Sequence, residues 1–296
     1  MGKRFSSIGE VMADLQAKQS KRLSEKQKQQ EEPGAVVEYE CDICKDTEFV
    51  TYNQPSTNGF SYEYGRPCEC RERKAWKRRF KNALIPDEFT HATFDNYSST
   101  EEIHNLLYDT AVNYLALYKK EGPKKTIPDS NLGFIAVFGE QRLKELESSK
   151  RSALKEKHNS FGLGKTHLQI AIAKRLIKDG FNVLVVSDVV LMDELIQAKR
   201  MNDEGEMLNR LLGNAISADV LLWDDIGKSK WSEAKESLYY QIINERYRKQ
   251  RPIIFSSNED RGTLAEKIGY AAASRLIGQC GLYLVEAEGT DYRLKK

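Results

Sequence analysis

No stretch of the 296-residue sequence approaches the roughly 18 consecutive apolar residues that a membrane-spanning helix needs. The opening stretch, MGKRFSSIGEVMADL, also lacks the apolar core of a secretory signal peptide. We therefore expect a cytoplasmic protein with no membrane partner.

The sequence also lacks an excess of charge of either sign. Forty-six basic residues stand against 44 acidic ones, a net charge of +2. This balance excludes a histone-like or polybasic protein, so any nucleic-acid site must be a local patch. The composition, 40% hydrophobic and 30% charged, is ordinary for an intracellular protein with a real core.

Cysteine is scarce and unevenly placed, which excludes a secreted disulfide framework. Four of the five cysteines form two close pairs, Cys41-x-x-Cys44 and Cys68-x-Cys70, and Cys280 stands alone. Two such pairs supply the four soft ligands of tetrahedral Zn²⁺, and with no open ligand position the metal would be structural. The alternative is a group of reduced, buried thiols. We favour zinc, although C-x-C departs from the more usual C-x-x-C.

From residue 131 onward, apolar runs alternate with helical patterns. Strands are expected at 133–138, 182–187, 219–225 and 252–258, and helices follow the first three. Continuous apolar strands separated by helices indicate a parallel sheet that is covered on both faces. The fold class is therefore α/β. In such sheets, ligands bind beyond the carboxyl ends of the strands.

Three of these strand ends carry residues suited to a nucleotide. The first leads to a glycine-rich turn that opens a helix, where backbone N–H groups and the helix dipole favour phosphate. Lys165 would reach the phosphates, Thr166 and Asp224 would hold Mg²⁺, Asp225 would orient water and Asn258 would sense the γ-phosphate. The residues with these expected roles are Gly162, Gly164, Lys165, Thr166, Asp224, Asp225 and Asn258. Alone, each has a blander interpretation as an ordinary turn or helix cap; together they predict a P-loop ATPase domain.

The phosphate-loop motif is nevertheless incomplete. G-x-x-x-x-G-K-[ST] requires its first glycine at position 159, which is Asn159. If Gly139 is the true start, 24 residues, 140–163, stand where four are expected. The longer loop costs only about 1.5 kcal/mol in closure entropy. Geometry is the harder requirement, because one helix over 140–158 would hold the ends about 28 Å apart. Two short helices, 141–147 and 150–157, turning at 148–149 would bring the ends together, and so would disorder.

These motifs resemble those of the AAA+ ATPases, and more narrowly the bacterial replicative helicase loaders of the DnaC/DnaI type. The resemblance rests on GLGKTHL, LLWDDIG, LYYQIINERYRKQRPIIFSSN, ASRLIG and DYR, over residues 131–296. It implies an ATPase that binds the hexameric replicative helicase and delivers it onto single-stranded DNA during replication initiation. It also implies that Arg275 is an arginine finger reaching a neighbouring subunit, and that Arg293 is a second sensor. Self-assembly through the ATPase domains follows from that role.

The resemblance suggests four segments: a polar, partly helical arm at 1–34, a zinc-binding helicase-interaction domain at 35–82, a helical linker at 83–130 and the ATPase domain at 131–296. In the second segment, a basic run at 71–81 includes Trp76 and Phe80. This run suits single-stranded nucleic acid or a helix docked on protein; we favour the protein because this domain resembles the part that grips the helicase. Lys199 and Arg200 are weak DNA candidates.

Three functions remain open. The first is the helicase loader with ATP, Mg²⁺ and structural Zn²⁺ as cofactors; because Asp225 is shorter than the usual Glu, we expect a weak, switch-like ATPase. The second is an IstB-like transposition helper that shares the same core and binds duplex DNA. The third is a helicase-binding adaptor whose interrupted phosphate loop no longer hydrolyses ATP.

Overall fold

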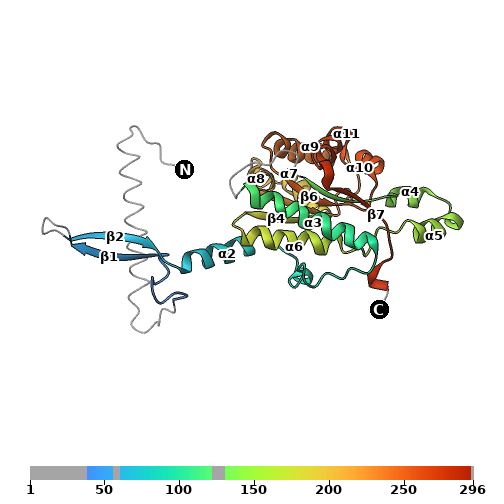
Figure 1. Ribbon diagram of the computed structural model, residues 1–296. Coiled ribbons are helices and arrows are strands. Elements are labelled where there is room, and N and C mark those ends of the chain that lie inside the picture. Colours follow the sequence, from blue (N-terminus) through green and yellow to red (C-terminus); the bar gives the residue numbers. More distant parts are fainter. Residues whose placement is uncertain (1–38, 56–60, 122–130, 295–296) are drawn as a thin grey trace. The chain divides into compact units, whose positions relative to one another are not determined.

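The computed structural model describes residues 39–55, 61–121 and 131–294 (Figure 1). The chain divides into two compact units, Met1–Arg71 and Glu72–Lys296. The expected arm at 1–34, with its apolar spacing at Ile8, Met12 and Leu15, lies outside the described residues.

The described part of the first unit is a hairpin flanked by the cysteine pairs. Strands β1 (Phe49–Pro55) and β2 (Ser61–Pro67) pair antiparallel along their full lengths. Tyr52 and Tyr64 face each other across the hairpin with ring centroids 5.9 Å apart. Helix α2 (Cys70–Asn82) begins in this unit and contains the basic run.

The second unit is built on the predicted parallel sheet. Its five strands are ordered β4-β5-β6-β3-β7, and every neighbouring pair is parallel. The last in this order, β7 (Leu284–Ala287), pairs with β3. The four expected strands are present as β3 (Leu132–Ala136), β4 (Val183–Ser187), β5 (Val220–Asp224) and β6 (Ile253–Ser256). The α/β fold class is therefore confirmed.

Helices cover both faces of the sheet, as the apolar strands require. On one face pack α3 (Glu102–Glu121) and α6 (Lys165–Lys178), with Phe134 and Leu222 pointing toward them. The opposite face carries Trp223 and Phe255 under a second set of helices (Figure 1). That set is α7 (Asp188–Arg200), α8 (Glu206–Ser217), α9 (Glu233–Arg248), α10 (Arg261–Ile268) and α11 (Tyr270–Gly278). Adjacent residues of one strand thus belong to opposite cores, because side chains alternate across a strand.

The expected helical linker contributes directly to the first of these cores. One apolar helical face is predicted here by the spacing of Ile103, Leu106, Leu107, Ala111, Tyr114 and Leu115. In α3, Leu107, Ala111, Tyr114 and Leu115 are buried, whereas Leu106 is half exposed. Lys174 of α6 donates to the main-chain carbonyls of Phe89 and Ala92 in the turn around η1 (Asp87–Phe89). The described residues of 83–121 thus pack onto the sheet, and the segment boundaries remain predictions.

The excursion between Gly139 and the phosphate loop forms two short helices, α4 (Glu140–Glu145) and α5 (Ser148–Lys157). This confirms the two-helix alternative, with the turn slightly earlier than expected. The rings of Phe138 and His158 stack with centroids 5.5 Å apart, so the chain leaves and returns at one place. The phosphate loop therefore begins after His158.

Candidate functional site: a nucleotide pocket and a four-cysteine cluster

The phosphate loop has the backbone conformation that its glycines predict. Gly162 and Gly164 have φ values of 68° and 75°, in the left-handed region that glycine enters without strain. Gly164 is the N-cap of α6, so the free N–H groups of that helix begin at Lys165. An N-terminal turn of this kind attracts phosphate through its N–H groups and dipole.

Lys165 lies at the centre of the site and is buried. Its Nζ donates to Asn258 Oδ1 at 2.8 Å and to the Ser257 carbonyl at 3.0 Å. Burial lowers the pKa of Lys165 to about 8, although the nearby carboxylates of Asp225 and Asp224 oppose this shift. The side chain is thus held in place at the end of β6 and is charged at neutral pH.

The acidic pair follows β5 and is held by two neighbouring elements. Asp224 Oδ1 accepts hydrogen bonds from Thr166 Oγ1 at 2.9 Å and from Ser256 Oγ at 2.7 Å. Burial raises the pKa of Asp224, and the charge of Asp225 raises it further. A hydroxyl beside a carboxylate is the oxygen set that Mg²⁺ takes in such sites, so Thr166 and Asp224 fit the cation.

Asp225 has a φ of 53°, which turns its side chain out of the strand direction. Its Oδ1 accepts from Asn258 Nδ2 at 2.8 Å, and its Oδ2 lies 3.7 Å from Lys228 Nζ. Ser256 Oγ, which donates to Asp224, also accepts from the Asp225 N–H at 3.0 Å. Through Ser256, one hydrogen-bonded group forms at the carboxyl edge of the sheet from Lys165, Thr166, Asp224, Asp225 and Asn258. The sequence placed all five there in advance, and their catalytic roles remain predictions.

Gly139 lies apart from this loop. It precedes α4, and its N–H donates to Asp260 Oδ2 at 2.9 Å. A Cβ at this position would lie 2.3 Å from Thr263 Oγ1, so a glycine is needed for close packing against the start of α10. Asn159, and not Gly139, occupies the first position of the loop; a nucleotide role for Gly139 stays a prediction.

The two arginines occupy different surroundings. Arg293 is bound to Asp291, with its Nε 3.3 Å from Asp291 Oδ1, and its positive charge helps to lower the pKa of Lys165. Arg275 lies on α11, where its guanidinium is 5.3 Å from the ring centre of Tyr240 and 5.8 Å from that of Tyr247. Arg293 thus belongs to the neighbourhood of Lys165, whereas the recorded contacts of Arg275 are all with α9 and its own helix.

Sequence reasoning missed several residues around the site. Tyr97, from the stretch FDNY, donates its hydroxyl to the Leu163 carbonyl at 3.0 Å and packs on Gly164. Asp188 is fully buried, and its carboxylate accepts from Trp223 Nε1, the Tyr239 hydroxyl and the Ser229 N–H. No local motif marks these residues, because their contacts cross 41 residues or more of sequence, apart from Asp188 to Trp223 at 35.

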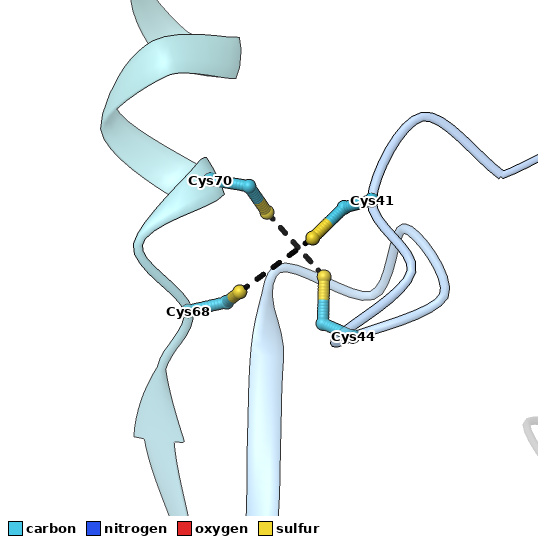
Figure 2. Close-up of side chains that lie close together, drawn as sticks. All are labelled: Cys41, Cys44, Cys68 and Cys70. Carbon is cyan, nitrogen blue, oxygen red and sulfur yellow. Dashed lines mark hydrogen bonds between the residues drawn. The ribbon is translucent and has the colours of Figure 1, made fainter.

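The four-cysteine cluster lies in the first unit and points its sulfurs at a common centre (Figure 2). All four ligand atoms lie within 4.8 Å of one another; Cys41 Sγ is 3.8 Å from Cys68 Sγ, and Cys44 Sγ is 3.4 Å from Cys70 Sγ. Tetrahedral zinc with Zn–S bonds of about 2.3 Å would set sulfurs roughly 3.8 Å apart, so the cluster fits such an ion.

Hydrogen bonds from main-chain N–H groups hold both cysteine pairs in place. The Asp46 carboxylate accepts from the Cys41 N–H at 3.0 Å, and the Cys68 N–H donates to the Glu48 carbonyl at 2.9 Å. Main-chain N–H donation from Cys44 lowers the pKa of Cys41 to about 7, which favours the thiolate that binds metal. The cluster is thus a metal-site candidate, and the identity of the metal as zinc remains a prediction.

In the described part of the chain, no helix is both long and apolar enough to cross a membrane. For the other residues that the sequence singled out, the structure gives position and exposure but does not define a role. Lys199 and Arg200 end α7 and are exposed. Trp76 is exposed on α2, and its ring stacks on Phe80 at 5.5 Å.

Comparison with known proteins gives matches over the α/β unit. The IstB-like ATP binding protein family matches residues 122–296. A putative ATP-binding protein of insertion sequence IS21 from Pseudomonas aeruginosa is 31% identical over 138 residues, 46% of this chain and 50% of the relative. The chain thus spans about half the length of that relative. The replicative helicase loader DnaC of Buchnera aphidicola is 31% identical over 115 residues, 39% of this chain and 46% of the relative.

Other matches extend further along the chain. The phage-like element PBSX protein XkdC of Bacillus subtilis is 25% identical over 268 residues, 86% of this chain and 85% of the relative. Crystal structures of a DnaC helicase loader and of DnaI align with TM-scores of 0.49 and 0.48, at 20% and 23% identity. They cover 66% and 70% of this chain, and 96% and 94% of theirs.

The family match confirms the AAA+ resemblance that the motifs indicated. It spans more than half of the chain and contains every residue of the hydrogen-bonded group around Lys165. The chain therefore belongs to the IstB-like ATP-binding proteins, within the AAA+ ATPases.

Proposed function

We propose that this protein is an ATP-dependent helicase loader, which binds a hexameric replicative helicase of the DnaB type and delivers it onto single-stranded DNA. The observation that carries the ATP-dependent part is the hydrogen-bonded group of Lys165, Thr166, Asp224, Asp225 and Asn258. A DnaC helicase loader among the relatives supports the choice of partner.

At the nucleotide site, each residue of the chain has one task. Lys165 binds the phosphates, and the N–H groups at the start of α6 close around their oxygens. Thr166 and Asp224 hold Mg²⁺, which neutralises charge on the phosphates when it is bound. Asp225 orients the attacking water, and Asn258 holds Asp225 in place. Because the Asp225 side chain is short, turnover is slow and serves as a timer.

The two arginines complete the cycle in different ways. Arg293 reaches the phosphates of its own nucleotide. Arg275 on α11 is presented by Tyr240 and Tyr247 to a neighbouring copy, whose γ-phosphate it contacts when the ATPase units assemble.

The first unit binds the helicase. The four-cysteine cluster, holding structural Zn²⁺, fixes the β1–β2 hairpin and the start of α2 without needing a large core. Beyond the boundary of this unit, in the second one, exposed Trp76 on α2 also suits contact with protein. The DNA lies along the assembled ATPase units, where Lys199 and Arg200 contribute positive charge.

A second candidate is an IstB-like transposition helper that binds duplex DNA, and the family match favours it specifically. The four-cysteine unit favours the loader, since it gives the chain a separate element for a protein partner. A pull-down with a DnaB-type hexamer, beside duplex and single-stranded DNA in gel-shift assays, distinguishes the two. Helicase capture that is lost after Cys44→Ser supports the loader; duplex binding without helicase capture overturns it.

The third candidate, an adaptor without ATP hydrolysis, is tested separately. Fluorescent ATP is titrated with Mg²⁺ against the protein and against Lys165→Ala, and phosphate release is followed with and without single-stranded DNA. Saturable binding that the variant loses supports a working site. Absence of binding in both proteins leaves a docking protein without nucleotide control.

A further inference from the structure

Asn159 stands where the phosphate-loop motif requires its first glycine, and its side chain is fully engaged. Oδ1 accepts from the Phe161 N–H at 3.2 Å, and Nδ2 donates to the Phe161 carbonyl at 2.8 Å. Nδ2 also donates to the Gly289 carbonyl at 2.8 Å, while the Gly289 N–H donates to the Asn159 carbonyl at 2.8 Å. A glycine could keep only the last of these four bonds.

The bonds to Gly289 are part of a longer contact between the loop and the end of the chain. On one side of Asn159, His158 Nδ1 lies 2.8 Å from Glu288 Oε2. On the other side, the Tyr292 N–H donates to the Gly162 carbonyl at 3.2 Å. Residues 288–292 therefore run along residues 158–162, and the Asn159 side chain lies at the middle of this contact.

This contact determines where Arg293 lies. Asp291 sits over Gly162, and a Cβ built on Gly162 would come 3.0 Å from Asp291 Cα. The carboxylate of Asp291 accepts from both the N–H and the Nε of Arg293, at 2.9 and 3.3 Å. The guanidinium is thereby held beside the loop while its side chain stays 68% exposed, with room to turn toward a ligand.

We propose that Asn159 is a positioning residue, which ties residues 288–293 to the phosphate loop and so presents Arg293 to the phosphates of a bound nucleoside triphosphate. This inference rests on the proposed nucleotide function. Asn159, where the sequence departs from the motif, thus adds a connection between the phosphate loop and the C-terminal segment that carries Arg293. Nucleotide bound in the loop is sensed at the end of the chain through the same bonds.

Asn159→Gly restores the phosphate-loop motif, and its nucleotide affinity distinguishes a positioning role for Asn159 from a tolerated replacement. If Asn159 were only a tolerated replacement, Asn159→Gly would leave nucleotide affinity unchanged or improve it. Here Asn159→Gly releases the C-terminal segment, so affinity falls about tenfold, the value of one charge-assisted contact from Arg293. Asn159→Asp keeps the side-chain volume and the bond from Phe161 but cannot donate to Gly289, so it releases the same segment, and its negative charge beside the phosphates lowers the affinity further.

The test combines a thermodynamic cycle with hydrogen exchange. Nucleotide dissociation constants are measured for Asn159→Gly, Arg293→Ala and the double variant by fluorescent-ATP titration. Because Asn159 acts through Arg293, the double variant binds no more weakly than either single one. Asn202→Gly is the matched control, since Asn202 is exposed on a bend and its side chain has no hydrogen-bond partner among the residues that the structure describes. Multiplied effects in the double variant overturn the proposal.

Hydrogen exchange is followed without nucleotide, which separates this inference from the proposed function. In Asn159→Gly, the amides of Gly289 and Tyr292 exchange about tenfold faster, while those of α6 and the Asn202→Gly control are unchanged. Unchanged exchange at both amides overturns the connection whatever the nucleotide does. If exchange responds but the wild-type protein binds no nucleotide, the connection stands, and both the nucleotide function and the role of Arg293 fall.

Discussion

Asn258 Nδ2 donates a 2.8 Å hydrogen bond to Asp225 Oδ1. This bond connects Asn258, two residues beyond the end of β6, to the acidic pair at the end of β5. The other end of the same amide accepts from Lys165 Nζ at 2.8 Å. One side chain therefore connects Lys165, the proposed phosphate-binding residue, to Asp225, the proposed water-orienting residue.

Replacing Asn258 should separate these two tasks. Asn258→Leu has a similar volume but makes neither bond, so Asp225 loses its orientation, and we expect ATP turnover to fall about 100-fold. Nucleotide affinity should change only a few-fold, because Lys165 keeps its bond to the Ser257 carbonyl. Steady-state phosphate release and fluorescent-ATP titration measure the two effects. Equal losses in both would show that Asn258 acts on binding and not on hydrolysis.

Lys165 gives the protein a defined pH response. Burial lowers its pKa from 10.5 to about 8, so the side chain is charged below pH 8 and neutral above it. Since only the charged form attracts phosphate, affinity should be flat below pH 8 and fall by up to about tenfold per pH unit above it. For folding the sign is reversed: between pH 8 and 10.5 the unfolded chain binds the extra proton, so this residue's contribution to stability rises with pH.

Lys165→Arg is the control for this response. A guanidinium stays charged across the whole range, so any binding that the variant retains should lose its dependence on pH near 8. Isothermal titration between pH 6.5 and 9.5 measures both proteins. A decline of the same shape in the variant would assign the effect to another group.

Sequence reasoning could place these residues at one edge of the sheet because each part of the candidate site is local in sequence. One short stretch of sequence shows the apolar strand that ends in Asp224 and Asp225. Another short stretch shows the turn that holds Gly164 and Lys165. The parallel alternation then determines that the strand ends meet at one edge of the sheet. The four cysteines were grouped by their spacing in the same way.

What could not be predicted depends on contacts between distant residues. The hairpin β1–β2 lies between the cysteine pairs, and strand β7 (Leu284–Ala287) is only four residues long. Its place beside β3 depends on pairing across about 150 residues, such as Gly133 with Leu284. The bond from Asn159 to Gly289 spans 130 residues, and no sequence pattern marks it.

Metal removal should unfold the first unit while leaving the α/β unit intact. The cysteine cluster is the sole group of buried residues recorded in the described part of that unit, with Val50 packed against it. Chelation, or Cys44→Ser, should therefore release one zinc per chain and abolish protease resistance of residues 39–71. Cys280→Ser is the matched control, because Cys280 is equally buried but lies in the other unit. Metal analysis and limited proteolysis decide; zinc loss in the control variant alone would place the metal elsewhere.

Arg246 should matter for stability and not for the reaction. It is fully buried, and its guanidinium donates to the main-chain carbonyls of Ala215, Ala218 and Pro252 at 2.6 to 2.9 Å. Arg246→Met would leave these carbonyls without a donor, and we expect it to cost about 3 kcal/mol of unfolding free energy. Arg248→Met on the same helix, exposed and paired with Glu245, should cost less than about 0.5 kcal/mol. Urea denaturation of both variants gives the comparison, and equal costs would contradict it.

Arg275 provides the test of self-assembly. Its guanidinium rests on Tyr240 and Tyr247, and no contact recorded for it in the described residues is with the group around Lys165. If it acts on a neighbour's nucleotide, Arg275→Ala should bind ATP normally but turn it over at least about 100-fold more slowly. Lys165→Ala should be inactive for the opposite reason, because it cannot bind ATP.

Mixing these two inactive variants should restore part of the turnover, since the intact Arg275 of one copy then faces the intact Lys165 site of the other. The restored rate should rise with protein concentration and be absent when both substitutions are in the same chain. Phosphate release across a series of mixing ratios measures it, with Arg248→Ala as the control for loss of a surface arginine. An inactive mixture at every ratio and concentration would mean that Arg275 does not act between copies, and the proposed assembly through α11 would have to be abandoned.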